Sequence, residues 1–442
     1  MKTIIFPAII LTILIASSPG YVYGLDGVTG YTDANCLECH DEMAADHGAS
    51  VHRDIPCLEC HIKAVEEDHE QVDLVDCVQC HAPHTEKTLH DAHTRVTCKA
   101  CHIGGGIPAI DPESKNIIFS GMFQPAMDLS LHQAIGPKTE EHCGECHFRG
   151  NELGASTMAL PAKSILCMPC HVATFSVGDK TSLVSSLIFI IGMIGLAIVW
   201  FSGSMNKRAS VTPKKIKGKA RTKPRTIFFN KFFQLLKEIF VEVVLLKRLF
   251  LQSPARWIIH SLIFFPFIFR FAFGLVALLL SIFLPDGSVT IAMLDKNHAM
   301  CALFFDVTGL MIFAGCMVAI VRKAREQSKK IDSLPEPGKI MSAMIGLIVL
   351  VGFVLEGLRI AMTGWINGSE LAFVGYCISL LFKGMTGLTD IYGYVWYAHA
   401  ILTGVFIALI PFTRMAHIIT APIVLIMNAR SRVKDRCKEN EI

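Results

Sequence analysis

Five long runs of apolar residues dominate the second half of the chain. They occupy residues 183–203, 255–284, 299–321, 340–365 and 391–413. A helix of about 20 apolar residues crosses the hydrocarbon core of a bilayer, so each run predicts a membrane-spanning helix. Residues 25–180 contain few periodic apolar runs, which predicts short helices and coil without a substantial sheet. The fold class we predict is therefore all-α, with a loop-rich domain followed by a five-helix transmembrane bundle.

The first 24 residues have the pattern of a secretory signal peptide. Lys2 precedes an apolar run over residues 4–16, and a small residue, Gly24, ends the segment. The run is shorter than an ordinary membrane span, which favours a cleaved signal over an anchor. An uncleaved anchor is the alternative, and both place residues 25–180 outside the cytoplasm.

Charge is distributed unevenly along the chain. Residues 25–180 contain 10 Lys and Arg against 24 Asp and Glu, whereas the rest of the chain contains 31 and 14. The basic residues gather between the first two spans, after the third span and at the C-terminus, and the other two loops are poor in them. Because basic loops stay in the cytoplasm, the C-terminus is predicted inside and residues 25–180 outside. Basic segments of this kind predict no nucleic-acid partner.

These patterns divide the chain into six segments of a multi-pass protein of the cytoplasmic membrane. They are a signal peptide, an extracytoplasmic domain, a first transmembrane helix, a basic cytoplasmic linker, a transmembrane domain and a cytoplasmic tail. Their bounds are 1–24, 25–180, 181–204, 205–252, 253–430 and 431–442. The linker includes an apolar run with interspersed charges over residues 228–251, which predicts an amphipathic helix on the inner surface.

Twelve of the 16 cysteines form six copies of the motif Cys-x-x-Cys-His. The copies are Cys36/Cys39/His40, Cys57/Cys60/His61, Cys77/Cys80/His81, Cys98/Cys101/His102, Cys143/Cys146/His147 and Cys167/Cys170/His171. In this motif the two thiols bond one haem covalently and the histidine binds its iron. Zinc sites more often use paired Cys-x-x-Cys without the following histidine, so the six copies predict six haems c.

Eight further histidines of the same domain are candidate distal haem ligands. They are His47, His52, His69, His84, His90, His93, His132 and His142. Six bis-histidine haems would need six of them, and the sequence does not assign the pairs. An iron with two histidine ligands has no open position, which suits electron transfer rather than substrate chemistry. A haem that lacks a distal ligand would instead provide a catalytic site.

Four histidines lie in or beside the apolar runs: His260, His298, His399 and His417. Ionisable residues inside a membrane are candidates for function. His399 and His417 would face the same side of an unbroken helix, about 27 Å apart at 1.5 Å per residue. His260 lies near the inner end of the second span, at the depth of His417. We therefore predict His260 and His417 as the axial ligands of an inner haem b.

Three segments resemble the dihaem cytochrome b family. They are Trp257-Ile-Ile-His260-Ser-Leu-Ile, Phe353-Val-Leu-Glu356-Gly-Leu-Arg359-Ile-Ala, and His399 with the later Pro411-Phe-Thr-Arg414-Met-Ala-His417. The family includes the gamma subunit of respiratory nitrate reductase and membrane subunits of sulfate-reduction and heterodisulfide reductase complexes. The resemblance covers about residues 183–430. It implies one or two haems b, and electron exchange between a quinone-type carrier and partner subunits.

The sequence departs from that family at Arg270, ten residues after His260, where the nitrate reductase pattern has a second histidine. His399 therefore lacks its expected partner. Either the outer haem b is absent, or another residue such as His298 takes this place. Arg270 would then hold a haem propionate or a quinone oxygen.

Four charged residues lie within the spans: Arg270, Asp306, Glu356 and Arg359. One interpretation is a set of neutralising pairs between helices. The functional interpretation is a quinone pocket near the outer face, in which Glu356 or Asp306 accepts a quinol proton as the electrons leave.

Together these patterns predict a quinol:cytochrome c oxidoreductase module. It would move electrons, in either direction, between a quinone pool and periplasmic cytochromes c or another external acceptor. The alternative is a quinone-independent conduit that links a cytoplasmic iron–sulfur subunit to periplasmic cytochromes. A terminal reductase that acts on a small oxidant at an open haem is a third class.

Overall fold

The computed structural model of the chain is mostly helical and divides into two compact units. The first unit comprises Met1–Pro83 and Val96–His142, and the second comprises His84–Arg95 and Cys143–Ile442. The structure describes residues 32–61, 77, 93–102, 108–119, 143–173, 177–208, 234–284, 287–327 and 337–439. Several predicted features lie outside the described residues: the signal peptide, Cys80, His81, His69, His84, His90, His132 and His142. The boundary between the units falls before Cys143, whereas the sequence places a domain boundary at residue 180.

Short helices in the first unit carry three of the Cys-x-x-Cys-His motifs. The helices are α2 (Asp33–Leu37), α3 (Glu42–Ala49), α4 (Cys57–Cys60) and α6 (Cys98–His102). Asp33 at the start of α2 accepts a hydrogen bond from the backbone N–H of Cys57, at 2.9 Å. This bond ties the first motif to the second.

A small hairpin follows α6. Strands β1 (Pro108–Ile110) and β2 (Ile117–Phe119) pair antiparallel, with Ala109 opposite Ile118. In the turn between them, the Asp111 carboxylate accepts hydrogen bonds from the backbone N–H groups of Glu113 and Ser114. In the part of the chain that the structure describes, this is the only strand pair, so the prediction of no substantial sheet agrees with it.

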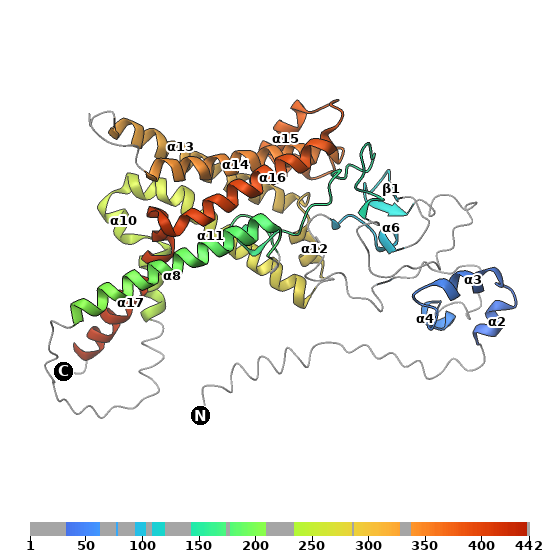
Figure 1. Cartoon of the computed structure of the whole chain (residues 1–442), viewed down its shortest axis with the longest axis horizontal. Helices are drawn as coiled ribbons and strands as arrows, with labels where there is room; N and C mark the ends of the chain where they lie inside the picture. Colours follow the sequence, from blue (N-terminus) through green and yellow to red (C-terminus); the bar gives the residue numbers. More distant parts are fainter. Residues whose placement is uncertain are drawn as a thin grey trace, which may run out of the picture. The chain divides into compact units, whose positions relative to one another are not determined.

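Five helices of the second unit are long and apolar enough to cross a membrane (Figure 1). They are α8 (Lys180–Arg208), α11 (Pro254–Phe283), α13 (Ala299–Gln327), α14 (Pro337–Met362) and α16 (Leu388–Leu409). They coincide with the five apolar runs, so the prediction of five spans is confirmed. Large apolar side chains remain exposed on their outer faces, such as Ile191 and Val199 on α8, as expected for helices that face lipid.

The interior of the bundle is organised around α14. This helix packs against α13, α16 and the short helix α15 (Phe373–Leu381), and α16 packs in turn against α8 (Figure 1). Ile312 and Cys316 of α13 have no exposed surface and contact apolar side chains of α14, among them Phe353. Shorter elements connect the spans: η3 (Ile165–Cys167), α12 (Ser288–Leu294) and η5 (Ser369–Leu371).

The last span does not continue as one helix from His399 to His417. Helix α16 ends at Leu409, and two 3-10 turns follow, η6 (Ile410–Phe412) and η7 (Arg414–Ala416). Pro411 has no N–H to donate to the helical ladder, which accounts for the break. Helix α17 (His417–Glu439) then begins at His417, so the two histidines belong to different helices.

The predicted amphipathic helix over residues 228–251 is also interrupted. Its first residues, 228–233, lie outside the described residues. A π-helical segment, η4 (Phe240–Val244), is separated from α10 (Lys247–Gln252) by Leu246, whose φ of 54° breaks the helix. Glu242 and Arg248 form an ion pair across the break, at 2.8 Å.

Candidate functional site

All five Cys-x-x-Cys-His motifs that the structure describes completely form helical turns. In four of them the backbone N–H of the histidine donates to the carbonyl of the first cysteine, at 2.9 to 3.0 Å. The fourth motif is itself the helix α6. Residues at i, i+3 and i+4 lie on one face of a helical turn. The two thiols and the imidazole of each motif are therefore on one side, as a covalently bound planar group requires.

The motifs differ in how far the structure encloses them, although the sequence presents them as equivalent. Cys39 and His40 of the first motif are exposed, since the turn that holds them has little packed over it. Cys101 of the fourth motif and Cys146 of the fifth are half-buried. A shared turn fixes which side the three groups face, but enclosure depends on what other segments pack there. For these motifs the assignment to haem c stays a prediction.

Three pairs of histidine rings lie at closely similar separations. The ring centroids of His171 and His399 are 6.1 Å apart. Those of His260 and His417 are 6.3 Å apart, and those of His93 and His147 are also 6.3 Å apart. A metal–imidazole bond is about 2 Å long, so two imidazoles on opposite sides of one metal have centroids about 6 Å apart. Each pair therefore has the spacing of two axial ligands.

Distance alone does not distinguish such a pair from ordinary ring packing, whose centroids lie about 4.5 to 7 Å apart. The identity of the residues does. His147 and His171 are the histidines of the fifth and sixth Cys-x-x-Cys-His motifs, and each meets a histidine from outside any motif. His260 and His417 are the pair predicted at one depth of the membrane, and the structure brings them together.

Backbone carbonyls fix the ring orientation of two of these histidines. The Nδ1–H of His147 donates to the Ser156 carbonyl at 2.5 Å, and that of His417 donates to the Arg414 carbonyl at 2.7 Å. In both rings Nε2 is then the nitrogen available to a metal. Burial, together with the nearby Lys163, lowers the pKa of His171 well below its usual range and keeps this ring in its neutral form.

A large cavity lies inside the membrane bundle beside the pair His171–His399. Its empty space, including the mouth, is about 1640 Å³. The thiols of Cys167 and Cys170 line it together with the rings of His171 and His399. The sixth motif thus faces the interior of the transmembrane bundle, with all three of its chemical groups directed to the same space. A covalently attached haem fits this set of groups.

The segment that carries the sixth motif is anchored to the bundle by apolar packing and close backbone approach. Met168 and Ala173 are buried against Leu278 of α11. A Cβ atom at Gly274 would lie 2.9 Å from the carbonyl oxygen of His171, so α11 needs glycine there. Small residues allow this kind of contact within membranes.

Polar contacts anchor the same segment at the start of α16. The Thr157 hydroxyl donates to the Thr389 carbonyl at 2.9 Å or to the Asp390 carboxylate at 2.7 Å. Arg149 forms an ion pair with the same carboxylate, at 3.1 Å. The sixth motif is therefore held as part of the membrane unit.

The four charged span residues lie together near this cavity. Arg270, Glu356 and Arg359 line it, whereas Asp306 is completely buried and accepts the backbone N–H of Val374. Glu356 and Arg359 are 3.8 Å apart and form an ion pair. The neutralising pair and the predicted pocket are thus two descriptions of one region.

Arg270 is held in place from both sides. Its Nε–H donates to the Thr308 hydroxyl at 2.7 Å, and a terminal N–H donates to the Phe305 carbonyl. The guanidinium also lies over the Phe305 ring, 5.2 Å from its centroid. A Cβ atom at Gly309 would lie 2.9 Å from the Arg270 guanidinium, so glycine makes room for it on α13.

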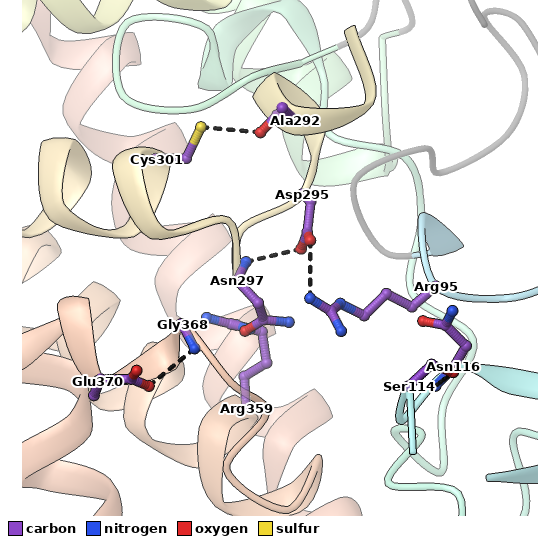
Figure 2. A network of polar contacts seen from close by, with 10 residues as sticks. All are labelled: Arg95, Ser114, Asn116, Ala292, Asp295, Asn297, Cys301, Arg359, Gly368 and Glu370. Atoms are coloured by element: carbon purple, nitrogen blue, oxygen red, sulfur yellow. Dashed lines mark hydrogen bonds and ion pairs between the residues drawn. The ribbon is translucent and has the colours of Figure 1, made fainter. Parts of the chain in front are cut away.

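A polar network extends from the cavity to the loop between α12 and α13 (Figure 2). Arg359 donates to the side chain of Asn297, and the backbone N–H of Asn297 donates to Asp295 at 2.8 Å. Asp295 forms an ion pair with Arg95 at 3.1 Å. The network fixes the loop on which Lys296 reaches the cavity.

Two lysines that sequence patterns do not single out complete the charged lining. Lys163 and Lys296 both line the cavity and lie beside each other. Burial, and then the charge of Lys296, lowers the pKa of Lys163 well below its usual range. The sequence signal is weak, because isolated lysines in loops are ordinarily solvent-exposed.

The remaining candidate histidines have simpler positions. His298 is exposed at the start of α13, and among the described residues no ring contact joins it to His399. The predicted pairing of His298 with His399 is therefore replaced by that of His171 with His399. In the first unit, His47 lies in the last turn of α3 and His52 in the turn after it.

Comparison with known proteins supports a membrane subunit of a redox complex. Residues 258–436 match the family described as the nitrate reductase gamma subunit. One subunit of the dihydromethanophenazine:CoB–CoM heterodisulfide reductase from Methanosarcina mazei is 23% identical over 255 residues. The matched region is 56% of this chain and 90% of that relative. No solved structure matches the chain.

The membrane half of the chain is thus similar to membrane electron-transfer subunits of redox complexes. The resemblance seen in the sequence is confirmed for this half. The residues that precede 258, which hold all six Cys-x-x-Cys-His motifs and the first span, lie outside the family match.

Proposed function

We propose that this protein is the membrane electron-transfer subunit of a quinol:cytochrome c oxidoreductase. The observation that carries the proposal is the sixth Cys-x-x-Cys-His motif, whose thiols and imidazole line a cavity inside the membrane bundle. A haem attached there would be in direct contact with transmembrane helices. The other motifs would continue the path through haems c outside the cytoplasm, to a periplasmic cytochrome or another external acceptor.

Haem b would be bound between His260 and His417. Their rings are correctly spaced for one iron, and they come from α11 and α17, which no other sequence feature connects. The matched gamma-subunit family binds haem b. From His260 to Gly274, which contacts the sixth motif, α11 rises about 21 Å at 1.5 Å per residue. The two sites would therefore occupy successive depths of one membrane.

Haem iron supplies one-electron transfer and no proton chemistry, so protons must be handled by the protein. Oxidation of one quinol to quinone releases two protons and two electrons. We assign Glu356 as the first proton acceptor, because it lines the cavity and lies 3.8 Å from Arg359. Arg359 and Arg270 would hold the quinone oxygens or haem propionates, and buried Asp306 would support Glu356 from behind.

The comparisons are compatible with a reduced small-molecule carrier as the donor. The name of the Methanosarcina relative includes dihydromethanophenazine, the reduced form of an electron carrier. For this chain we propose a quinone-type carrier. The basic segments would face the cytoplasm, where the positive-inside rule places them, and would be available to a cytoplasmic iron–sulfur subunit if one is present.

The test of this function is a redox titration of the purified full chain, with quantification of haem types, followed by addition of a reduced quinol analogue. We expect six haems c and at least one haem b, with both types reduced by quinol in the absence of any other donor. If haem b is present and quinol reduces nothing, the quinone-independent conduit is the better description. If no haem b is found, the assignment of His260 and His417 fails.

Replacing Glu356 by glutamine should slow quinol oxidation while leaving the haem content intact. Glutamine keeps the volume but cannot take up the quinol proton, and loss of a positioned base typically costs about 100- to 10,000-fold in rate. Stopped-flow reduction of the haems by quinol measures the effect. Glu370→Gln is the matched control, since Glu370 is exposed and caps a loop by accepting the Gly368 N–H (Figure 2). Equal rates for wild type and E356Q would remove Glu356 from the mechanism.

Replacing His93 by alanine should convert one haem c from low spin to high spin. The pair His93–His147 assigns His93 as the distal ligand of the haem at the fifth motif, and its removal opens that iron. Electron paramagnetic resonance of the oxidised protein detects the change, and the number of covalent haems should remain six. A spectrum identical to that of wild type would show that another residue ligates this haem.

A further inference from the structure

We propose that His399 is the distal axial ligand of the haem c bound by Cys167, Cys170 and His171. This haem c would then occupy the membrane position of the outer haem b, and the chain would carry a single haem b. The inference rests on the proposed function only in requiring that haem is attached at the sixth motif.

The first support is the geometry of the two rings. The His171 and His399 centroids are 6.1 Å apart with planes inclined at 66°, close to the values of the His260–His417 pair. His399 projects from α16 toward α14, where Gly352 leaves space: a Cβ atom there would already be 3.6 Å from Cε1 of His399. Both rings line the same cavity as the two thiols.

The second support is that a haem b would lack a second ligand at this depth. Among the residues that line the cavity, the histidines are His171 and His399 only. Arg270 stands on α11 where a facing ligand would be needed, and its guanidinium is already bound to Thr308 and Phe305. A guanidinium stays protonated in proteins and has no lone pair for iron. His171 therefore supplies the ligand that α11 lacks.

The third support is the charge of the cavity lining. Four basic side chains line it (Lys163, Arg270, Lys296 and Arg359), against two carboxylates (Asp179 and Glu356). The formal excess of two positive charges matches the two propionates that every haem carries. Bringing Lys163 beside Lys296 is unfavourable unless an anion lies near them, because like charges within a few ångströms repel strongly in a low dielectric. A propionate at this position would relieve that repulsion.

The decisive experiment compares His399→Ala with wild type in the full chain, produced in a host that attaches haem c. Haems b and c are counted by pyridine haemochrome spectra, and spin states are read by electron paramagnetic resonance. We expect wild type to contain six c and one b, all low spin. In H399A the counts should stay at six and one, while one haem c becomes high spin and returns to low spin when imidazole is added.

The variant His399→Met provides a readout if the alanine variant folds poorly. Methionine in place of histidine keeps the iron six-coordinate and raises its reduction potential. A redox titration of H399M should therefore show one haem c at a higher potential and the b potential unchanged. His298→Ala is the matched control, because this exposed histidine is the other candidate partner of His399, and its spectra and potentials should equal those of wild type.

Two different results would overturn the inference, and they are distinguishable. If H399A loses haem b while every haem c stays low spin, His399 ligates a haem b, and the proposed electron-transfer function stands without this inference. If mass spectrometry of the peptide around Cys167 finds no attached haem, the inference and the proposed wire through the sixth motif both fail.

Discussion

Replacing His417 by alanine is expected to abolish haem b binding and leave all covalent haems c in place. The ring of His417 lies 6.3 Å from that of His260, and no other described histidine ring contacts this pair. Haem b is held only by axial ligands and packing, so removal of one of the two ligands should release it during purification. Haems c are bound through thioethers and should be retained. Pyridine haemochrome spectra measure both types in one sample.

The companion variant His260→Ala should have the same effect, because a shared iron requires both rings. His298→Ala should retain full haem b. If the His417 and His260 variants differed, with one retaining haem b, the two rings would not be ligands of a common iron. In that case their contact would be ordinary packing at the end of the bundle.

Much of the membrane architecture can be predicted from the sequence. Each span is an uninterrupted apolar run longer than a bilayer requires, and that signal is local to each helix. The pairing of His260 with His417 can also be predicted, since both lie at the same end of the spans. The family resemblance points to the same two residues.

The pairing of His171 with His399 cannot be predicted in this way, because two assumptions hide it. The spacing of the sixth motif equals that of the other five, which places it with them in a domain that ends before the first span. The structure instead packs this motif against α11, through contacts such as that of Gly274 with the His171 carbonyl. Glycines in spans are the available signal, but nothing local says which segment approaches them.

The continuity of the last span is hard to predict for a different reason. The spacing of His399 and His417 fits five helical turns, so an unbroken helix is the simplest interpretation. Pro411 ends the regular ladder, and Thr413 caps the turn that follows by accepting the Met415 N–H. The break replaces one helix with two ligands by two helices with one each. It leaves the assignment of His417 intact, because that assignment depends on His260.

Replacing both Cys167 and Cys170 by alanine is expected to cut electron transfer between the membrane and the outer haems. Five haems c should remain, and haem b should be retained, because His260 and His417 are untouched. Without haem at the sixth motif, the proposed path loses the one site built into both the c-type series and the membrane bundle. Addition of quinol should then leave the remaining haems c oxidised on the time scale on which wild type reduces them.

Cys316→Ala and Cys377→Ala are the matched controls, since neither cysteine belongs to a motif or lines the cavity. Both should reduce their six haems c at the wild-type rate. If the double variant also reduced its five remaining haems c at that rate, electrons would reach them without passing through the membrane cavity. The acceptor site would then have to be a haem of the first unit, and the sixth motif would be a structural anchor of the bundle rather than its exit for electrons.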